Sequence, residues 1–244
     1  MKNTSLLFFL TLFFLSSTSF AQYYVKLEGG YNLSLNSMNI GFNVIYNPGD
    51  YTYEAVNGSF GKGVNFSGTF GYYFCSNVGL ELGLIYKLST EFEQNVQGPN
   101  GNISDTWNGS FFGFAPTFVI NAPLEKIKLF AKIGLLIALP TSEIEIVNIS
   151  GETQKATFSS GIDFGLSGGA GVLVPLSSKI DFIAEFVFVS FTWKPNEVEQ
   201  TYFDGTTETI KLEDKFNSND ENTQGPVFIP FSNVGLNVGV KINL

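Results

Sequence analysis

Apolar and polar side chains alternate every second residue over much of the chain, most clearly over residues 78–88 (VGLELGLIYKL). Leu80, Leu82 and Leu84 fall on one side of an extended strand, whereas Glu81 and Lys87 fall on the other. A helix would spread the same leucines around its circumference, but a strand gathers them on one face. The pattern therefore predicts β-strands.

The same test finds eight alternating segments. They cover residues 23–34, 63–74, 78–88, 110–120, 127–138, 161–174, 180–192 and 234–244. In segment 180–192 both faces are largely apolar after Glu185, which a β-bulge or a locally hydrophobic interior would explain.

The connections between these segments alternate strictly between short and long. Residues 75–77, 121–126 and 175–179 are short turns, whereas residues 34–62, 89–109, 139–160 and 193–233 are long. Short turns on one side and long loops on the other are typical of an up-and-down barrel in a membrane. No stretch after residue 21 has the 18 or so uninterrupted apolar residues of a spanning helix. We therefore expect an all-β fold, an eight-stranded antiparallel up-and-down transmembrane β-barrel with both termini in the periplasm.

The composition of the two strand faces bears on whether the barrel is soluble or embedded in a membrane. A soluble lipocalin-like barrel also has eight alternating strands, but it has an apolar lumen and a charged outer face. Here the apolar face carries no charge, and the polar face combines glycines with equal numbers of lysines and acids, which suits a crowded, closed lumen. The predicted lumenal charges are Lys26, Glu28, Glu81, Lys87, Lys128, Lys132, Asp163, Asp181, Glu185 and Lys241. Eight strands leave an interior only just wide enough for side chains, which favours a structural ion-pair network over a gated ion path.

Residues 1–21 have the features of a secretory signal peptide. Lys2 supplies a positive start, residues 6–15 (LLFFLTLFFL) are apolar, and small residues lead to a cleavage site before Gln22. We therefore expect an exported barrel domain over residues 22–244.

Composition restricts the chemistry that the chain can perform. The 244 residues include no histidine and no arginine, and the net charge is -9. These facts argue against histidine-dependent catalysis, histidine-ligated metals and nucleic-acid binding. Cys75 has no partner for a disulfide or a metal set, and residues 165–171 (GLSGGAG) lie inside a strand segment rather than in a phosphate-binding loop. We expect no enzymatic activity, no cofactor and no metal site.

The net negative charge belongs to the long connections, where sixteen acids face five lysines. The last connection contains Glu197, Glu199, Asp204, Glu208, Glu213, Asp214, Asp220 and Glu221. A soluble, mutually repulsive outer surface is the simpler interpretation. The alternative is that divalent cations bridge the loops to one another or to anionic lipopolysaccharide.

Three stretches carry a family resemblance: residues 23–35 (YYVKLEGGYNLSL), the hairpin 71–86 (GYYFCSNVGLELGLIY) and the terminal strand 234–244. The mature chain resembles small eight-stranded outer-membrane barrels of the OmpX, OmpW, OmpA-barrel and PorT-like types. The resemblance implies location in the outer membrane, contact with its lipid and lipopolysaccharide, and assembly by the barrel-insertion machinery. Leu244 replaces the usual C-terminal aromatic residue. Neither an activity nor an oligomeric state is implied.

Three functions fit these features. The leading hypothesis is a plugged barrel anchor that displays four long acidic loops to other surface components. A second is a narrow channel for small or hydrophobic solutes, with an apolar lumen near Ile183, Val187 and Val189. A third, from the PorT-like resemblance, is an accessory barrel that works with envelope or secretion proteins.

Overall fold

The computed structural model describes residues 22–47, 50–99, 101–159, 161–212, 223–224 and 227–244. The predicted signal peptide lies outside these residues. None of the described residues forms a helix long and apolar enough to cross a membrane. The regular structure consists of seventeen β-strands: β1 (Gln22–Ser34), β2 (Met38–Asn47), β3 (Asp50–Gly58), β4 (Gly63–Cys75), β5 (Val78–Ser89), β6 (Phe92–Gly98), β7 (Gly101–Pro123), β8 (Lys128–Val147), β9 (Thr153–Ser159), β10 (Asp163–Pro175), β11 (Ile180–Ser190), β12 (Thr192–Trp193), β13 (Glu197–Thr201), β14 (Thr207–Leu212), β15 (Thr223–Gln224), β16 (Ile229–Pro230) and β17 (Asn233–Asn243).

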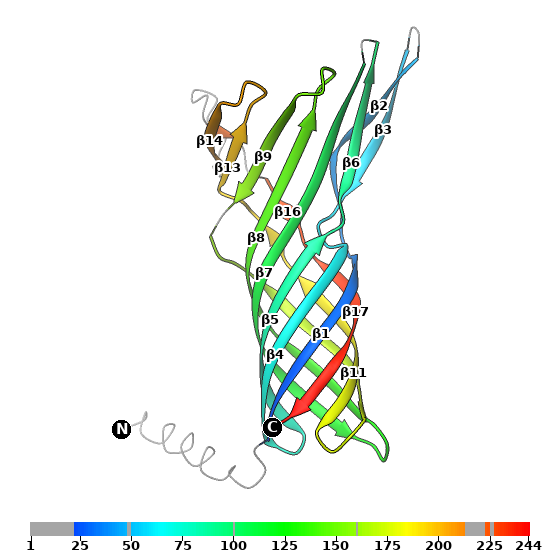
Figure 1. Cartoon of the computed structure of the whole chain (residues 1–244), viewed down its shortest axis with the longest axis vertical. Coiled ribbons are helices and arrows are strands. Elements are labelled where there is room, and N and C mark those ends of the chain that lie inside the picture. The colour runs from blue at the N-terminus through cyan, green and yellow to red at the C-terminus, as the bar shows by residue number, and fades with distance from the viewer. Residues whose placement is uncertain (1–21, 48–49, 100, 160, 213–222, 225–226) are drawn as a thin grey trace, which may run out of the picture.

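Eight of these strands form a barrel (Figure 1). In the ring β1–β4–β5–β7–β8–β10–β11–β17 each strand pairs antiparallel with the next one, and β17 closes the ring by pairing with β1. Each of the eight strands overlaps one of the eight predicted segments, so the predicted fold class is confirmed. The C-terminus and the short turns lie at one end of the barrel (Figure 1).

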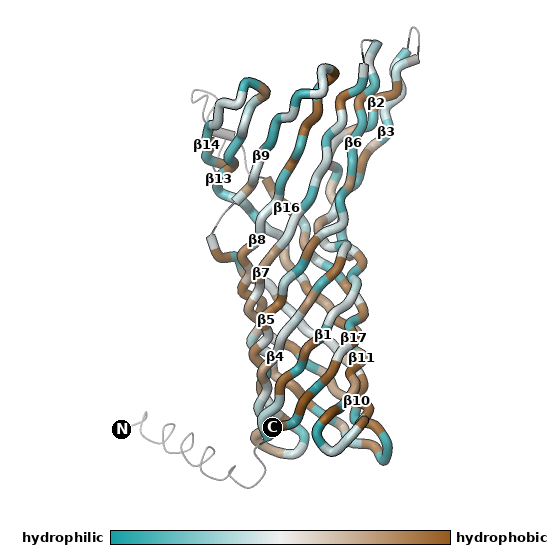
Figure 2. Tube along the Cα trace, viewed as in Figure 1, coloured by the Kyte–Doolittle hydropathy of each residue, from teal (hydrophilic) through white to brown (hydrophobic). Residues whose placement is uncertain are grey.

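The two faces of the barrel wall divide as the alternation predicts. Outward-pointing residues of β5 are exposed, with Leu80, Leu82 and Leu84 each about half accessible, whereas Glu81 and Lys87 are buried inside. Hydrophobic residues recur between more polar ones along the barrel strands (Figure 2). The wall therefore presents hydrocarbon to lipid and encloses the charges, as a membrane barrel must.

The strands continue well beyond the barrel at the end opposite the short turns, which corrects the prediction of long loops there. β7 begins at Gly101 rather than near 110, and β8 ends at Val147 rather than near 138. The two strands pair with one another out to Ser104 and Val147. The sequence carries the reason, because residues 143–147 (EIEIV) still alternate and so continue the β-structure.

Two sheets extend from these long strands. We call the first the β2–β3–β6 sheet: β6 pairs antiparallel with β7, and β2 joins β6 through the parallel pair Val44–Val96. The second, the β9–β13–β14 sheet, continues from β8 and includes the short parallel strand β15. The connections predicted as loops thus contain strands that project beyond the barrel at the end opposite the short turns (Figure 1).

Segment 180–192, which was ambiguous in the sequence, forms the regular strand β11 up to Ser190, and Thr192 already belongs to β12. β11 pairs with β10 and with β17 without a shift of register, so it contains no bulge. Ile183 and Val189 point inward and are buried. The interior is therefore locally hydrophobic beside this strand.

Inward-facing glycines make room for large side chains on the neighbouring strands. A Cβ atom at Gly79 would lie 2.7 Å from the ring of Tyr73, and one at Gly71 would overlap the ring of Tyr24. On β10, a Cβ atom at Gly169 would overlap the carboxylate of Glu185. The glycine-rich polar face thus gives an eight-stranded lumen enough width for its aromatic and charged residues.

Candidate functional site

An ionic layer crosses the middle of the lumen, formed by side chains from four strands around the ring. Lys26 of β1 pairs with Glu81 of β5. Lys132 of β8 lies 2.8 Å from Glu185 of β11 and 4.0 Å from Glu81. Tyr24 donates its hydroxyl to Glu81 at 2.6 Å. The layer joins opposite walls of the barrel by charge-assisted hydrogen bonds.

Two further charges lie near this layer. Glu28 is 6% exposed, and neither of its carboxylate oxygens has a hydrogen-bond partner among the described residues. Lys241 places its ammonium 4.2 Å from the ring centre of Tyr24 and 4.8 Å from that of Tyr73. Both ring contacts are in the range of cation–π interactions, which are strongest when the cation is shielded from water.

An apolar cluster fills the lumen towards the short turns. It consists of Tyr24, Tyr73, Val119, Phe130, Leu173 and Ile183. The Tyr24 and Tyr73 rings stack with their centres 4.8 Å apart. This end of the lumen is thus packed with side chains.

Four asparagines form a ladder along the lumenal wall on the other side of the ionic layer. The Asn65 amide donates to Asn32 at 2.9 Å and to Asn237 at 3.0 Å, and Asn32 donates to Asn233 at 2.8 Å. Gly30 faces Asn237 across the β1–β17 seam, and a Cβ atom at this glycine would overlap the asparagine amide. The ladder satisfies buried amides with one another and links three adjacent strands.

A cavity lies beyond the ionic layer and offers about 50 Å³ of space to the centres of water molecules. Glu81 and Lys132 of the ionic layer line it, as do Lys87 and the apolar side chains of Phe111 and Val189. Lys87 is 1% exposed and donates a hydrogen bond to the carbonyl oxygen of Gly61. The cavity therefore has a charged, hydroxyl-rich side and an apolar side.

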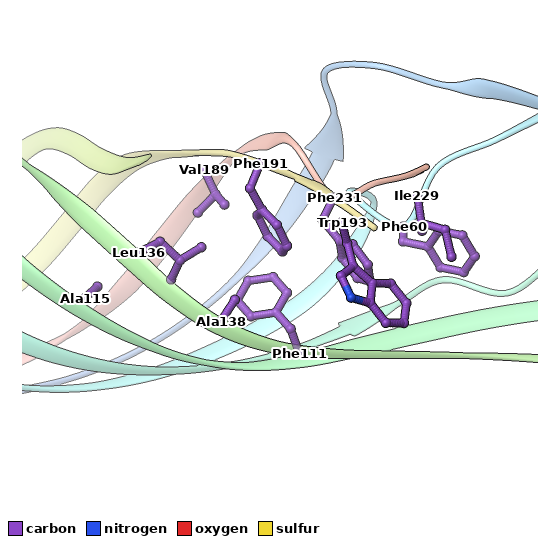
Figure 3. Packing of buried hydrophobic residues seen from close by; sticks show 10 residues of the cluster. All are labelled: Phe60, Phe111, Ala115, Leu136, Ala138, Val189, Phe191, Trp193, Ile229 and Phe231. Atoms are coloured by element: carbon purple, nitrogen blue, oxygen red, sulfur yellow. The ribbon is translucent and has the colours of Figure 1, made fainter. Parts of the chain in front are cut away.

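An aromatic lid covers the lumen above the cavity (Figure 3). It comprises Phe60, Phe111, Ala115, Leu136, Ala138, Val189, Phe191, Trp193, Ile229 and Phe231. Phe191 and Phe231 stack at 5.2 Å, and Phe111 packs edge-on against Phe191 at 5.3 Å. The two-stranded pair of β12 and β16 carries Trp193 and Ile229 over the barrel mouth. Aromatic packing of this kind contributes beyond simple area burial.

The ten predicted lumenal charges are not all brought together. Lys26, Glu81, Lys132 and Glu185 form the ion pairs of the layer. Asp181 lies opposite Lys241 on the neighbouring strand and accepts a hydrogen bond from Asn243 at 3.3 Å. Lys128 and Asp163 are only partly buried near opposite ends of the barrel, and neither forms an ion pair in the described structure. Lys87 bonds to a carbonyl instead of a carboxylate. The three residues that were predicted to line an apolar path for solutes do not lie together. Ile183 is buried in the apolar cluster near the short turns, whereas Val187 and Val189 line the cavity.

Ion pairs of the surface connections lie where the β9–β13–β14 sheet continues from β8. Lys155 lies 3.2 Å from Glu145 and 3.4 Å from Glu143, and these carboxylates raise the pKa of the Lys155 ammonium. Among the described residues, no three acids, cysteines or histidines are positioned to hold a metal ion. Glu213, Asp214, Asp220 and Glu221 of the last connection lie outside the described residues.

Sequence reasoning missed the aromatic lid. Phe60, Trp193 and Phe231 lie in connections between alternating segments, where periodicity carries no information about which way a side chain points. The available signal was local: residues 227–231 (VFIPF) and 191–193 (FTW) are apolar islands in otherwise polar connections. Such islands indicate segments that fold back onto a core.

A family model described as the outer membrane protein beta-barrel domain matches residues 7–207, which is more than half of the chain. The chain belongs to this family. Membership in the outer membrane protein beta-barrel domain family places the protein in the outer membrane of the cell. The ionic layer and the aromatic lid therefore lie inside an outer-membrane barrel.

Solved structures include similar outer-membrane barrels. OprG from Pseudomonas aeruginosa aligns with a TM-score of 0.50 and 9% identity over 92% of this chain and 96% of that chain, which supports the fold alone. Neisserial surface protein A aligns at 0.45 with 10% identity over 92% and 99% of the two chains. Ail, the attachment invasion locus protein of Yersinia pestis, aligns at 0.36 with 11% identity over 92% and 97%. The comparison with curated protein sequences gave no match.

Proposed function

We propose that this protein is a non-enzymatic, non-conducting anchor of the outer membrane whose projecting β-sheets contact other components of the cell surface. The observation that carries the proposal is that the lumen is closed twice. The ionic layer ties Lys26, Glu81, Lys132 and Glu185 across it, and the aromatic lid covers the mouth. An ion would have to break both closures to pass.

The energetic cost of opening the ionic layer supports a static plug. Glu81 and Glu185 are each 1% exposed, so separation of either from its lysine leaves a charge in surroundings of low polarity. Leaving a buried charge without its partner typically costs about 3–5 kcal/mol. The ionic layer and the aromatic lid would have to open at the same time, so a conducting state would rarely be populated.

The projecting sheets provide the contact surface in this proposal. The described part of the β2–β3–β6 sheet carries Asp50, Glu54 and Glu93 but no lysine. This charge favours basic segments of envelope or secretion proteins, or lipopolysaccharide bridged through divalent cations. Outer-membrane lipid and the barrel-insertion machinery are the further partners that we propose.

Planar-bilayer recordings of the refolded mature chain test the anchor function. We expect no reproducible conductance steps from the wild type. Phe111→Ala combined with Phe231→Ala removes two rings of the lid, and Lys26→Ala combined with Glu81→Ala empties part of the ionic layer. Each pair alone should stay closed, whereas the quadruple variant should conduct. Reproducible conductance steps from the wild type would contradict the anchor function and support a channel.

A small hydrophobic channel is the competing function, since Val187 and Val189 line the cavity beneath the lid. In that case uptake of a small apolar dye into vesicles should rise in the lid variant alone. If dye uptake rises only when the aromatic lid and the ionic layer are both removed, the result would favour the anchor function.

A further inference from the structure

The cavity beneath the lid contains a buried cation that has no anionic partner in the described structure. The Lys87 side chain is 1% exposed, and its only hydrogen bond to the described part of the chain is to the carbonyl oxygen of Gly61. No carboxylate of the described residues forms an ion pair with it. An ammonium group has three N–H donors, so at least two of them have no acceptor in the described protein.

Hydroxyl groups on the same cavity are also without protein partners. Thr69 and Thr117 are 7% and 6% exposed, and the described residues provide no hydrogen bond to either hydroxyl or to that of Ser67. Buried polar groups in native proteins are almost always satisfied by protein, water or a bound ion. A polar occupant of the cavity would satisfy these groups.

The charge balance of the cavity lining favours an anion. Of the three charged side chains that line it, Glu81 is paired with Lys26 and Lys132 is paired with Glu185, so Lys87 is the one lining charge without a counter-charge among the described residues. Lys87 follows Glu81 by six residues on β5, roughly 20 Å along an extended strand, so an anion beside Lys87 is remote from the carboxylates of the layer.

The size of the cavity limits the anion to a few atoms. It offers about 50 Å³, compared with roughly 150 Å³ for an engineered protein cavity that binds benzene. Chloride, nitrate, formate and acetate are of suitable size, whereas sugar acids and phosphate esters are too large. We propose that Lys87, together with the hydroxyl of Ser67 on the adjacent strand β4, forms an internal binding site for a small monovalent anion, which is enclosed when the lid packs over the lumen.

Bromide is a direct probe of this site. Mature protein refolded in detergent with sodium bromide and then crystallised should give an anomalous diffraction peak within hydrogen-bond distance of Lys87 Nζ. Lys87→Met keeps the length and apolar stem of the side chain but removes the charge, so it should lose the peak. Lys126→Met, in an exposed turn, is the matched control and should keep it.

Stability in solution gives a second measurement. Urea unfolding is followed at constant ionic strength while bromide replaces gluconate, which is too large for the cavity. Above the dissociation constant, each tenfold rise in bromide should raise the folded-to-unfolded ratio tenfold in the wild type. Lys87→Met should show no dependence.

Filling the cavity provides a test that leaves Lys87 in place. A Cβ atom at Gly83 would meet Thr69 Oγ1 at 3.4 Å and the Ala115 carbonyl oxygen at 3.6 Å, which are ordinary contacts. Gly83→Val should therefore fold but lose both the bromide peak and the bromide dependence, and it decides the question if Lys87→Met does not fold. A wild type without a peak, or a bromide dependence equal in all variants, would overturn the proposal. The conductance result does not affect this test.

Discussion

Glu81 offers the sharpest test of the ionic layer. Its carboxylate accepts the Tyr24 hydroxyl at 2.6 Å, pairs with Lys26 and lies 4.0 Å from Lys132. Glu81→Gln keeps the shape and the acceptor for tyrosine but leaves Lys26 without a counter-charge. Lys132 retains Glu185 at 2.8 Å, so the damage is confined to one lysine.

The expected magnitude follows from burial, because Lys26 and Glu81 are each 1% exposed. Removing one member of a buried ion pair costs about 3–5 kcal/mol of unfolding free energy. With a urea dependence of about 1–3 kcal/mol per molar, the unfolding midpoint should fall by roughly 1–5 M. The surface variant Glu143→Gln, which loses a half-exposed contact with Lys155, should cost no more than about 1 kcal/mol.

Urea unfolding in lipid vesicles, followed by the fluorescence of Trp107 and Trp193, measures these changes. The double variant Lys26→Met with Glu81→Gln removes both charges and should be more stable than Glu81→Gln alone, because no lysine is left unpaired. If Glu81→Gln cost less than about 1 kcal/mol, or if the two single changes simply added, the layer would not act as a buried ion-pair network.

The remaining predictions concern packing, pH and topology. Gly239→Ala places a methyl group against the adjacent strand in the lumen and should lower the unfolding free energy by about 1–3 kcal/mol in the same urea assay. Gly68→Ala on the outer face, where the nearest atom is 3.8 Å away, should leave the unfolding free energy unchanged. Equal losses for the two variants would contradict the difference between the faces. Burial raises the pKa of Asp105 above 3.8, so its ionisation destabilises the fold as pH rises from that value. Asp105→Asn should therefore be more stable than the wild type at pH 7 but not below pH 3.8, and a gain that does not change with pH would refute this cause. Cys75 is exposed beside a short turn, so an impermeant maleimide should label it only after the outer membrane is permeabilised. Ser150→Cys in a Cys75→Ser chain should instead be labelled on intact cells. The reverse pattern would show that the barrel has the opposite orientation.

The barrel could be predicted from the sequence because its determinants are local and periodic. In residues 78–88, each side chain was assigned to the correct face, since a lipid-facing strand tolerates no charge outside and a narrow lumen favours charges and glycine inside. The same alternation located the eight barrel strands, although β7 and β8 extend further than the segments that were identified.

The interior contacts could not be predicted in the same way. Periodicity places Lys87 in the lumen, but whether it meets a carboxylate depends on strand register and tilt, which a single sequence does not contain. The lid depends on Trp193 and Phe231 folding back over the mouth from a connection without periodicity. Equal numbers of lysines and acids therefore predicted a neutral lumen but not which charges pair.

The seam between β1 and β17 has a consequence for how the molecule assembles. Asn32 and Asn233 bond across it although they are 201 positions apart in the chain. Contacts of such high sequence separation form late, because a long loop must first be closed. The ionic layer draws on β1, β5, β8 and β11, so its charges stay unmatched until the ring is nearly complete. We therefore expect a partly built barrel to be disfavoured in lipid and the β1–β17 seam to close late in assembly.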